Sequence, residues 1–565
     1  DSNVTLSLGN TVAEQDSTAS FKSVLATQVV PSTGKWVWEI KQTVSSFVGD
    51  GYATTGVAST DVARSIGRSG SGSITFDYQS STSKIRKFGG GDSDYATSVS
   101  LTNTNFTIQF AVDSDAEELK LFVSNSQVGT TLDISSLTKP YKIISQIYTG
   151  GNVDHTLVTN SANFVNNVPS EYKTIYTSNL SAPTVTDPRA HYATALYTGT
   201  AQSKTVRQCF DSTGTAWTPD WVWVKCRSDA GEHVLVDSVR GAANVLTPDH
   251  EAAEFLDVKA VTSFIEGGFT LGNGDDRNDS NDNAKTYVAF CMKAGGAPTV
   301  ENDNTSSAMD DGSVFKSGVV QTSYTPSGSP SNYPQKMSIA SHGGFSIVKY
   351  TGTGANATVP HGLSTTPTMV MVKPLTQAHS WAGYHSAYGT GSGNDKVFRW
   401  DTSHQGGDQA GDAWQNNPFA NAHTITFGSQ TGQNENNIPH IMYTWARTPG
   451  MIGIGSYTGN GDADGPTVVV DDGVSGFRPA WLMIKRITAA ENWIIFNSGS
   501  DTHNPAGHYL MADATNAEND HSGGNDVDFL ANGFRLRSLN AGTNGSGTYI
   551  YLAFADQPFN LARAK

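Results

Sequence analysis

One strand signature occurs three times in this chain of 565 residues, and it limits the folds that the chain can adopt. The signature reads TPDWVWVK at 218–225, TPTMVMVK at 366–373 and RPAWLMIK at 478–485. Each copy follows a Tyr-Thr-Gly tripeptide and precedes a Gly/Phe strand and a terminal aromatic strand. A repeat of about a hundred residues is too long for a solenoid unit and suits one β-sandwich domain. The sequence therefore predicts an array of similar β modules.

The composition is typical of an all-β chain with many turns. Gly is abundant at 57 residues, aromatic residues reach 10% and charged residues only 16%. The formal net charge of −16 argues against nucleic acid as a partner, because phosphate binding needs clustered Lys and Arg. We interpret the acidity as a property that keeps an exposed, extracellular protein soluble. No apolar stretch approaches the ~18 residues that a membrane span requires, which argues against membrane insertion.

The cysteines Cys209, Cys226 and Cys291 are too few for a disulfide framework. All of them fall within the first repeat, so we predict that they are small buried hydrophobic side chains. The chain begins at Asp1, and the following TLSLGN already has the character of a strand and a turn. We therefore expect the natural start to lie upstream, so that the N-terminal domain is incomplete.

Residues 1–174 have a strand pattern of their own. In GKWVWEIK (34–41) apolar and charged residues alternate, which predicts a half-buried strand with Glu39 on its polar face. The segments 106–113 and 118–123 also alternate and are joined by only four residues. That spacing predicts a β-hairpin.

The remainder of the chain divides where composition and periodicity change. We predict a linker, three modules and a Pro/Ser-rich connector, at residues 175–190 (linker), 191–296 (first repeat), 297–343 (connector), 344–449 (second repeat) and 450–565 (third repeat). Five or more strand candidates in each module suit a two-sheet antiparallel sandwich. The second and third repeats follow each other without a linker and are expected to be fixed together, whereas the connector leaves the first repeat able to hinge.

The N-terminal part resembles a known domain family on these motifs. Residues 18–170 look like a SPRY-type, concanavalin A-like β-sandwich. GKWVWEIK resembles the GK-aromatic-aromatic-E strand of that family, Gly56-Val57-Ala58 its GVA strand, and the hairpin that ends in SNSQVG its FNG…LG hairpin. ANFVNNVPSEY (162–172) resembles the closing strand, although Val165 stands where the family usually has Gly.

The repeats resemble the lectin-like, jelly-roll-like sandwiches that follow such domains in tail-fibre and minor structural proteins of phages, many of them marine. The most similar stretch begins WTPDWVWVKCRSDAGEHVLVDS at Trp217, and YTGTG (350–354) and the ending YLAFADQPFNLARAK match too. The resemblance implies an all-β protein of tandem antiparallel β-sandwiches, one SPRY-like and three jelly-roll-like. It also implies a virion component that acts outside the cell. Its motifs are core and turn residues, so no catalytic or ligand-binding residue carries over.

One acidic run has the ligand types of a calcium site. GNGDDRNDSNDN (272–283) holds four carboxylates, Asp275, Asp276, Asp279 and Asp282, together with Asn side chains. These are the hard oxygen ligands that Ca²⁺ prefers, although the run does not fit the EF-hand pattern. The alternative is a solvated acidic hairpin loop.

Sugar recognition uses exposed aromatic faces beside Asp and Asn hydrogen bonders. Trp381 and Trp493 fall on the second strand of their modules, where the first module has Val234, and are predicted to be core residues. Trp414 lies in the irregular loop DQAGDAWQNNPF, which no repeat matches. We therefore take one group as a candidate ligand contact surface, with loop-anchoring aromatics as the alternative: Trp414, Tyr384, His385 and Tyr388.

Constant strands with divergent loops favour a recognition function. We expect a tail fibre or appendage that presents loops to a host-surface glycan or receptor and binds other virion proteins, with repetition raising avidity. A homo-oligomer is expected, and a trimer is favoured because phage fibres are commonly trimeric. Two alternatives stay open: an architectural capsid or tail decoration, and a glycan depolymerase that uses a pair of carboxylates. No nucleophile elbow, phosphate loop or dinucleotide fingerprint supports an enzyme.

Overall fold

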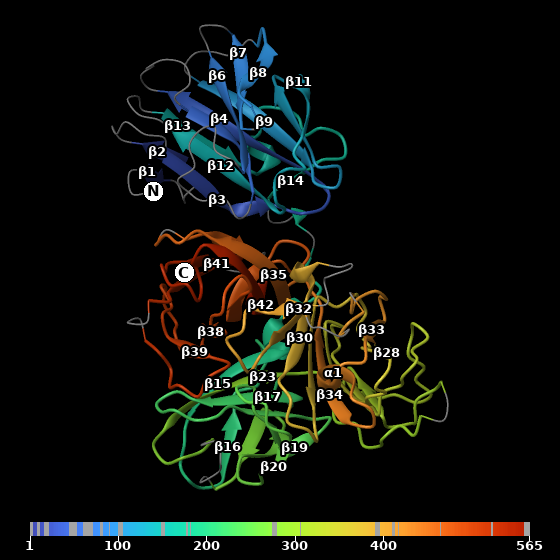
Figure 1. Ribbon diagram of the computed structural model, residues 1–565. Helices are drawn as coiled ribbons and strands as arrows, with labels where there is room; N and C mark the ends of the chain where they lie inside the picture. Colours follow the sequence, from blue (N-terminus) through green and yellow to red (C-terminus); the bar gives the residue numbers. More distant parts are fainter. Residues whose placement is uncertain are drawn as a thin grey trace. The chain divides into compact units, whose positions relative to one another are not determined.

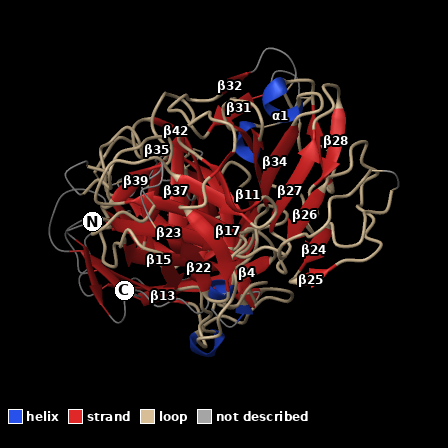
Figure 2. Cartoon of the chain, turned by 90° about the horizontal axis from the view of Figure 1, so that it is seen from below, coloured by secondary structure: helices blue, strands red, loops and turns tan. Residues whose placement is uncertain are grey.

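In the computed structural model the regular secondary structure is almost wholly β-strand, with many loops between the strands, which confirms the predicted all-β class (Figure 2). The structure describes residues 4–7, 12–15, 22–44, 53–59, 72–79, 83–89, 91–99, 105–147, 153–176, 179–180, 182–273, 280–304, 307–389, 396–408, 413–415, 417–463, 465–520 and 524–558. The helical segments among these residues are single turns: η1 (Ser161–Asn163), η3 (Pro188–Ala190), η4 (Ser386–Tyr388) and α1 (Thr431–Asn434). Within the described ranges, no helix is long and apolar enough to cross a membrane.

The chain forms two compact units, one of residues 1–182 with 466–469 and one of residues 183–465 with 470–565. The N-terminal unit contains two mainly antiparallel sheets. The strands of the first are, in order, β1 (Val4–Ser7), β2 (Val12–Gln15), β13 (Val153–Val158), β4 (Lys35–Val44), β9 (Asn105–Asp113), β10 (Glu118–Val123) and β11 (Ser126–Asp133), with β14 (Lys173–Thr174) parallel to β4. The strands of the second are β3 (Lys22–Val30), β12 (Tyr141–Ile147), β5 (Ala53–Ala58), β6 (Ser73–Gln79), β7 (Lys84–Phe88) and β8 (Ser93–Thr97).

The core of this unit lies between its two sheets. Phe110 of β9 stacks on Trp38 of the neighbouring β4, with ring centroids 5.5 Å apart, and also contacts Phe76 of the other sheet. The predicted hairpin is confirmed by β9 and β10, whose register pairs Val112 with Leu119. Alternation along each strand thus decides which side chains enter the core.

Glu39 does not face solvent, as the alternation predicts, but is fully buried. Its carboxylate accepts hydrogen bonds from the backbone N–H groups of Val165 (2.8 Å) and Asn166 (2.7 Å) and from the Asn166 side chain (2.9 Å). The closing segment of the unit therefore covers this face of β4. A buried carboxylate is tolerated here because it is hydrogen-bonded.

The second unit repeats one sheet order three times. In each module the strand that carries Tyr-Thr-Gly pairs with the terminal aromatic strand, which pairs with the signature strand and then the second strand. The first module has β15 (Tyr192–Thr198), β23 (Thr286–Met292), β17 (Trp221–Cys226), β18 (Val234–Asp237), β19 (Gly241–Leu246) and β20 (Phe255–Leu256). The second has β27 (Phe345–Thr351), β34 (Pro439–Trp445), β29 (Met369–Pro374), β30 (Ala382–His385), β31 (Lys396–Arg399) and β32 (Gly407–Asp408). The third has β35 (Ile452–Gly459), β42 (Gly547–Pro558), β37 (Phe477–Arg486), β38 (Ile494–Asn497) and β39 (Tyr509–Met511).

Smaller sheets complete the modules. They are formed by β16 (Lys204–Arg207), β22 (Gly268–Leu271) and β21 (Val261–Ile265), by β28 (Ala357–Pro360) and β33 (Thr424–Phe427), and by β40 (Val527–Leu530) and β41 (Gly533–Leu536). The connector adds β24 (Val314–Lys316), β25 (Val319–Val320) and β26 (Lys336–Ile339) to the edge of the second module, where β26 pairs with β27. The segment counted with the N-terminal unit carries β36 (Thr467–Val469).

The three modules share one core, so the first does not hinge freely as its long connector suggests. Trp223 of the first module contacts Trp400 of the second (5.0 Å between centroids) and Trp481 of the third (6.5 Å). Trp381 and Trp493 are buried, as predicted. The three cysteines are also free and buried, which confirms their assignment as hydrophobic side chains.

The modules contact one another in a cyclic order. The Lys that ends each signature donates from Nζ to a carbonyl oxygen of another module: Lys225 to Thr515 (3.1 Å), Lys373 to Glu251 (2.7 Å) and Lys485 to Ser403 (3.0 Å). The residue eight positions later bonds the same neighbour: His233 to Met511 (3.1 Å), Trp381 to Thr247 (2.9 Å) and Trp493 to Arg399 (2.8 Å). The first module thus contacts the third, the third the second, and the second the first.

This head-to-tail contact closes a ring of three modules within one chain (Figure 1, lower part). In homo-oligomers the same kind of interface, repeated around an axis, produces a closed trimer.

The structure changes the alignment of the repeats at one position. The counterpart of Trp381 and Trp493 is His233, not Val234, because Asp237 and Asn497 occupy the same register opposite the signature strand.

Candidate recognition site

The structure does not place the predicted aromatic group on the surface. Trp414, Tyr384 and His385 are fully buried and Tyr388 is nearly so. The Tyr384 ring lies edge-on to Trp414, with centroids 6.2 Å apart, and the His385 ring accepts a hydrogen bond from the N–H of Ala387 (3.0 Å). Burial lowers the pKa of His385 to about 3, so its imidazole is neutral. These side chains anchor the loops from inside, and the expectation of a contact surface is corrected.

The acidic run is described only in part. Asp275, Asp276 and Asp279 lie outside the described residues. Asp282 is described, and its carboxylate lies 2.9 Å from the Lys285 ammonium group. Within the described part of the chain, no group of three or more His, Cys, Asp or Glu side chains is placed to hold a metal ion. The calcium site therefore stays a prediction.

An exposed aromatic side chain occurs elsewhere, at Phe210, with 38% of its surface accessible. Phe210 lines a pocket of about 210 Å³ between the first and third modules. We call it the seam pocket. The first module and the residues directly before it supply Arg189, Tyr192, Ala193, Thr194, Gln208 and Phe210, and the third module supplies Ala480, Ser498, Gly499, Ala555 and Asp556.

Phe210 lies on a tight hairpin that hydrogen bonds hold in place. The Asp211 carboxylate accepts from the Thr213 hydroxyl (2.7 Å) and from the N–H groups of Thr213 (2.9 Å) and Thr215 (2.8 Å). The hydrogen bond from the Thr213 hydroxyl contributes most to lowering the pKa of Asp211, and the two backbone N–H groups lower it further. Phe210 pairs with Ala216 across the hairpin. The aromatic ring is therefore presented from a defined backbone.

A second carboxylate, that of Asp187, fastens this hairpin to the start of the module. It accepts from the N–H (2.9 Å) and hydroxyl (2.7 Å) of Ser212 and from the N–H of Arg189 (3.2 Å), where it caps η3. The indole N–H of Trp217 donates to the Arg189 carbonyl oxygen (2.8 Å). Arg189 and the hairpin that carries Phe210 are thus joined by one network of hydrogen bonds.

The charged groups of the pocket come from both modules. Arg189 Nη2 lies 3.2 Å from Asp556 Oδ1, and Arg478 Nη1 lies 3.6 Å from the other carboxylate oxygen. Such partly exposed pairs contribute little to stability. A guanidinium has five N–H donors, so Arg189 keeps donors for a ligand while it contacts Asp556. A fixed aromatic ring beside these groups is an arrangement that can bind a sugar ring.

Residues 187–333 and 315–558 match a family described as a domain of unknown function (DUF7483). The chain belongs to this family. No curated protein matches the chain. Both sides of the seam pocket, from Arg189 to Asp556, lie within the DUF7483 region.

Solved structures also match the chain. The TRIM65 PSpry domain is 14% identical over 28% of this chain and 86% of its own, with a TM-score of 0.22. The SPRY domain of human HERC1 is 15% identical over 27% of this chain and 91% of its own, with a TM-score of 0.23. Stonustoxin is 18% identical over 28% of this chain and 27% of its own, with a TM-score of 0.22. The two sheets of the N-terminal unit themselves define it as a β-sandwich.

In the DUF7483 region the connector runs from the first module to the second, and the second module continues directly into the third. Gly295, at the end of the first module, lies so close to the carbonyl oxygen of Phe315 in the connector that a Cβ would not fit between them. The contact between the first and third modules has no covalent crossing. It is there that the seam pocket opens.

Sequence reasoning missed Phe210 because its hairpin has no strand period. One signal was present: the turn sequence Asp211-Ser212-Thr213-Gly214 directly after an aromatic residue marks a ring beside a surface turn.

Of the described residues that line the pocket, Asp556 is the only acid. Most glycosidases place two carboxylates across the scissile bond, whereas the described lining of this pocket supplies one.

Proposed function

We propose that this protein is a structural and receptor-recognition component of a phage particle, a tail fibre or appendage, and that it binds a host-surface glycan. The observation that carries the proposal is the seam pocket, where Phe210 is exposed beside the Arg189–Asp556 pair. The acidic composition and the resemblance of the repeats to phage structural proteins support it further.

The division between buried strands and exposed loops supports recognition. The signature strands β17 and β29 are buried along their whole length, and each lies between two other strands. Sequence change in them would disturb the shared core, whereas change in the loops would not. The ring thus works as a rigid support for variable contacts.

The ring also bears on the expected trimer. Three modules of one chain already make the cyclic contacts that a trimer would make. The proposed fibre or appendage therefore gains three-part symmetry in this unit from a single chain, and any homo-oligomer would form through other surfaces.

A second candidate function, an architectural decoration that binds other virion proteins, is favoured by one exposed edge. Leu256 of β20 is 70% accessible and Val258 is 65% accessible, and β20 is the last strand of its sheet. Exposed apolar side chains on an edge strand are typical of protein contact sites.

Binding to a glycan array and inhibition of phage adsorption by the purified chain test the proposal. We expect Phe210→Ala to reduce both at least tenfold, because stacking on the aromatic face is lost. Tyr176→Ala is the matched control, since Tyr176 is an exposed aromatic residue outside the seam pocket. Equal loss in the two variants, or binding that Phe210→Ala leaves unchanged, would remove the seam pocket from recognition. Failure of the wild-type chain to bind glycans or cells would favour the architectural role.

A further inference from the structure

A larger hollow lies in the N-terminal unit, where the two sheets end in neighbouring edge strands. It has a volume of about 550 Å³, within the range of small-molecule sites, and it lies between β8 and the β10–β11 hairpin. We call it the edge groove. Thr97, Ser98, Ser124 and Gln127 contribute polar side chains to its lining, and Val99 and Val123 contribute apolar surface.

Both edge strands bulge where they border the groove. In β8 the pairing with β7 skips Tyr95, and in β11 the pairing with β10 skips Gly129, Thr130 and Thr131. Bulges of this kind re-aim side chains and end strand pairing. Because both edges are interrupted at the groove, neither offers the continuous row of backbone groups that strand addition by a peptide requires.

The two bulges are tied together across the groove. The Tyr95 hydroxyl donates to the carbonyl oxygen of Thr130 (2.5 Å), and its ring lies edge-on to Phe76 at 5.1 Å. Burial raises the pKa of Tyr95 to about 12, so the phenol stays protonated as a donor. A Cβ on Gly129 would lie 2.6 Å from the Tyr95 ring, so only Gly allows this contact.

The mouth of the groove is fixed as well. Ser124 and Asn125 have φ values of 49° and 65°, the type I′ turn that joins β10 to β11. The N–H of Asn125 donates to the Asn166 side chain (2.8 Å), and the Asn125 side chain accepts from the N–H of Asn167 (2.6 Å). The groove is therefore preformed, which lowers the entropy cost of binding.

The lining has the chemistry of a neutral, hydroxyl-rich ligand. None of the described residues that line the groove is charged. Charged groups on β7 and β8 pair with one another, as Lys84 with Asp94 (2.6 Å) and Arg86 with the same carboxylate (3.8 Å). Hydroxyl and amide groups can both donate and accept, as sugar hydroxyls do, and the valines can contact the C–H face of a sugar ring.

We propose that the edge groove is a second binding site, specific for neutral saccharides and separate from the seam pocket. Thr97 and Gln127, on opposite walls, supply its hydrogen bonds, and Tyr95 supports the wall between them. Phosphorylated, sulfated or carboxylated sugars bind less well because the groove offers them no cation.

The test uses the full chain on an array that carries neutral oligosaccharides together with sialylated and uronate-containing ones. We expect binding to at least one neutral oligosaccharide, and a loss of about tenfold or more in the double variant Thr97→Ala/Gln127→Ala, as two ligand hydrogen bonds are removed. Ser126→Ala is the matched control, because Ser126 is an exposed residue of the same strand that does not line the groove. A thermal melt verifies that each variant is folded.

The outcomes separate this site from the seam pocket. Neutral binding that survives Phe210→Ala but not Thr97→Ala/Gln127→Ala supports the proposal. Neutral binding that Phe210→Ala abolishes and the double variant keeps would overturn it and leave the seam pocket standing. Binding of acidic glycans alone, or of extended peptides in place of glycans on a peptide array, would also overturn it.

Discussion

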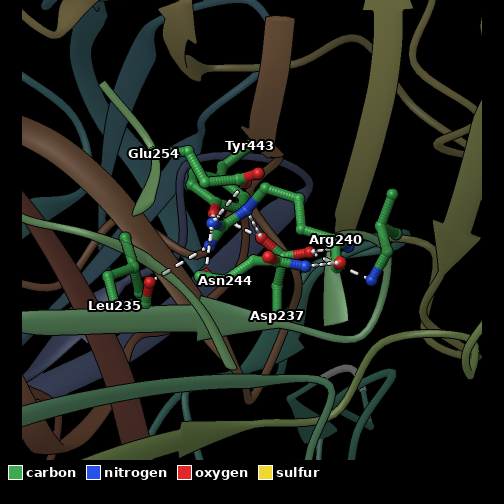
Figure 3. A network of polar contacts seen from close by, with 7 residues as sticks. Leu235, Asp237, Arg240, Asn244, Glu254 and Tyr443 are labelled. Carbon is green, nitrogen blue, oxygen red and sulfur yellow. Dashed lines mark hydrogen bonds and ion pairs between the residues drawn. The ribbon is translucent and has the colours of Figure 1, made fainter. Parts of the chain in front are cut away.

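Tyr443 of the second module donates its hydroxyl hydrogen bond to the Asp237 carboxylate of the first module, at 2.7 Å (Figure 3). The same carboxylate oxygen lies 2.5 Å from Arg240 Nε, and Arg240 Nη1 lies 3.0 Å from Glu254. Burial opposes the charge on Arg240, but the neighbouring carboxylates outweigh it and hold the pKa of Arg240 above its usual value. The residues in the register of Tyr443 are Phe290 and Leu552, which have no hydroxyl. This network therefore distinguishes one of the three contacts in the ring.

We expect Tyr443→Phe to lower the free energy of unfolding by about 2 kcal/mol, because a hydrogen bond to a buried charge is lost. Urea unfolding measures the change. Tyr457→Phe is the matched control, since the Tyr457 hydroxyl donates to a neutral carbonyl, that of Thr543, at 2.6 Å. Its cost should be about 1 kcal/mol. Equal costs for the two variants would show that the ionic acceptor adds nothing.

His233 should make the ring sensitive to acid. Burial lowers its pKa to about 3 from the ordinary 6.5, so the unfolded chain binds a proton between these values and the folded chain does not. The free energy of unfolding should therefore fall as the pH drops from about 6.5 toward 3, by up to about 1.4 kcal/mol per pH unit from this group. Urea unfolding at a series of pH values measures the slope.

The other modules show how to remove this histidine. Trp223 donates to His233 at 2.8 Å, and the equivalent pairs in the other modules are Met371 with Trp381 and Met483 with Trp493. We expect the double variant Trp223→Met/His233→Trp to fold and to show a shallower slope below pH 6.5. The single variant His233→Trp should cost more at pH 7, because the Trp223 N–H loses its acceptor. His503→Gln, an exposed histidine, is the control and should leave the slope unchanged. A double variant as acid-sensitive as the wild type would exclude His233 as the source.

The contact that closes the ring has an ion pair of its own. Arg227 Nε lies 3.0 Å from both carboxylate oxygens of Glu518, and Nη2 lies 2.6 Å from Oε2. The Glu518 side chain is buried and Arg227 largely so. We expect Glu518→Ala to lower the free energy of unfolding by about 3 kcal/mol, since it leaves a largely buried guanidinium unpaired. Asp94→Ala, which breaks the exposed pair with Lys84, should cost under about 1 kcal/mol. Similar costs would mean that this contact does not depend on the ion pair.

Periodicity predicts the parts of the fold that depend on local sequence. The alternation of apolar residues located β4 and the β9–β10 hairpin, and the repeat alignment placed Trp381 and Trp493 in the core. The ring could not be predicted in this way, because its contacts join residues far apart in sequence, such as Lys225 and Thr515. A strand pattern records which face is buried but not what covers it.

The aromatic residues Trp414 and Phe210 also show that a local sequence pattern does not determine whether a side chain is buried. Trp414 has no period around it, which suggested exposure, yet it packs on Phe427 of β33 at 5.7 Å and is buried. Phe210 also has no period and is exposed, because its hairpin bonds to itself through Asp211. Identical sequence signals therefore led to opposite environments. Only the tertiary neighbours of each ring decide between them.

The buried carboxylate of Glu39 should control the mouth of the edge groove from a distance. It holds the N–H groups of Val165 and Asn166, and the Asn166 side chain in turn accepts from the N–H of Asn125 in the turn at the groove. We expect Glu39→Gln to free the 165–167 segment, because an amide has one acceptor oxygen in place of two. Amide hydrogen exchange at Asn125 and Asn166 should then become at least tenfold faster. Glu118→Gln, a substitution of the same kind at the partly exposed start of β10, is the control and should leave both rates unchanged. Unchanged exchange in Glu39→Gln would mean that this loop is held by its backbone alone.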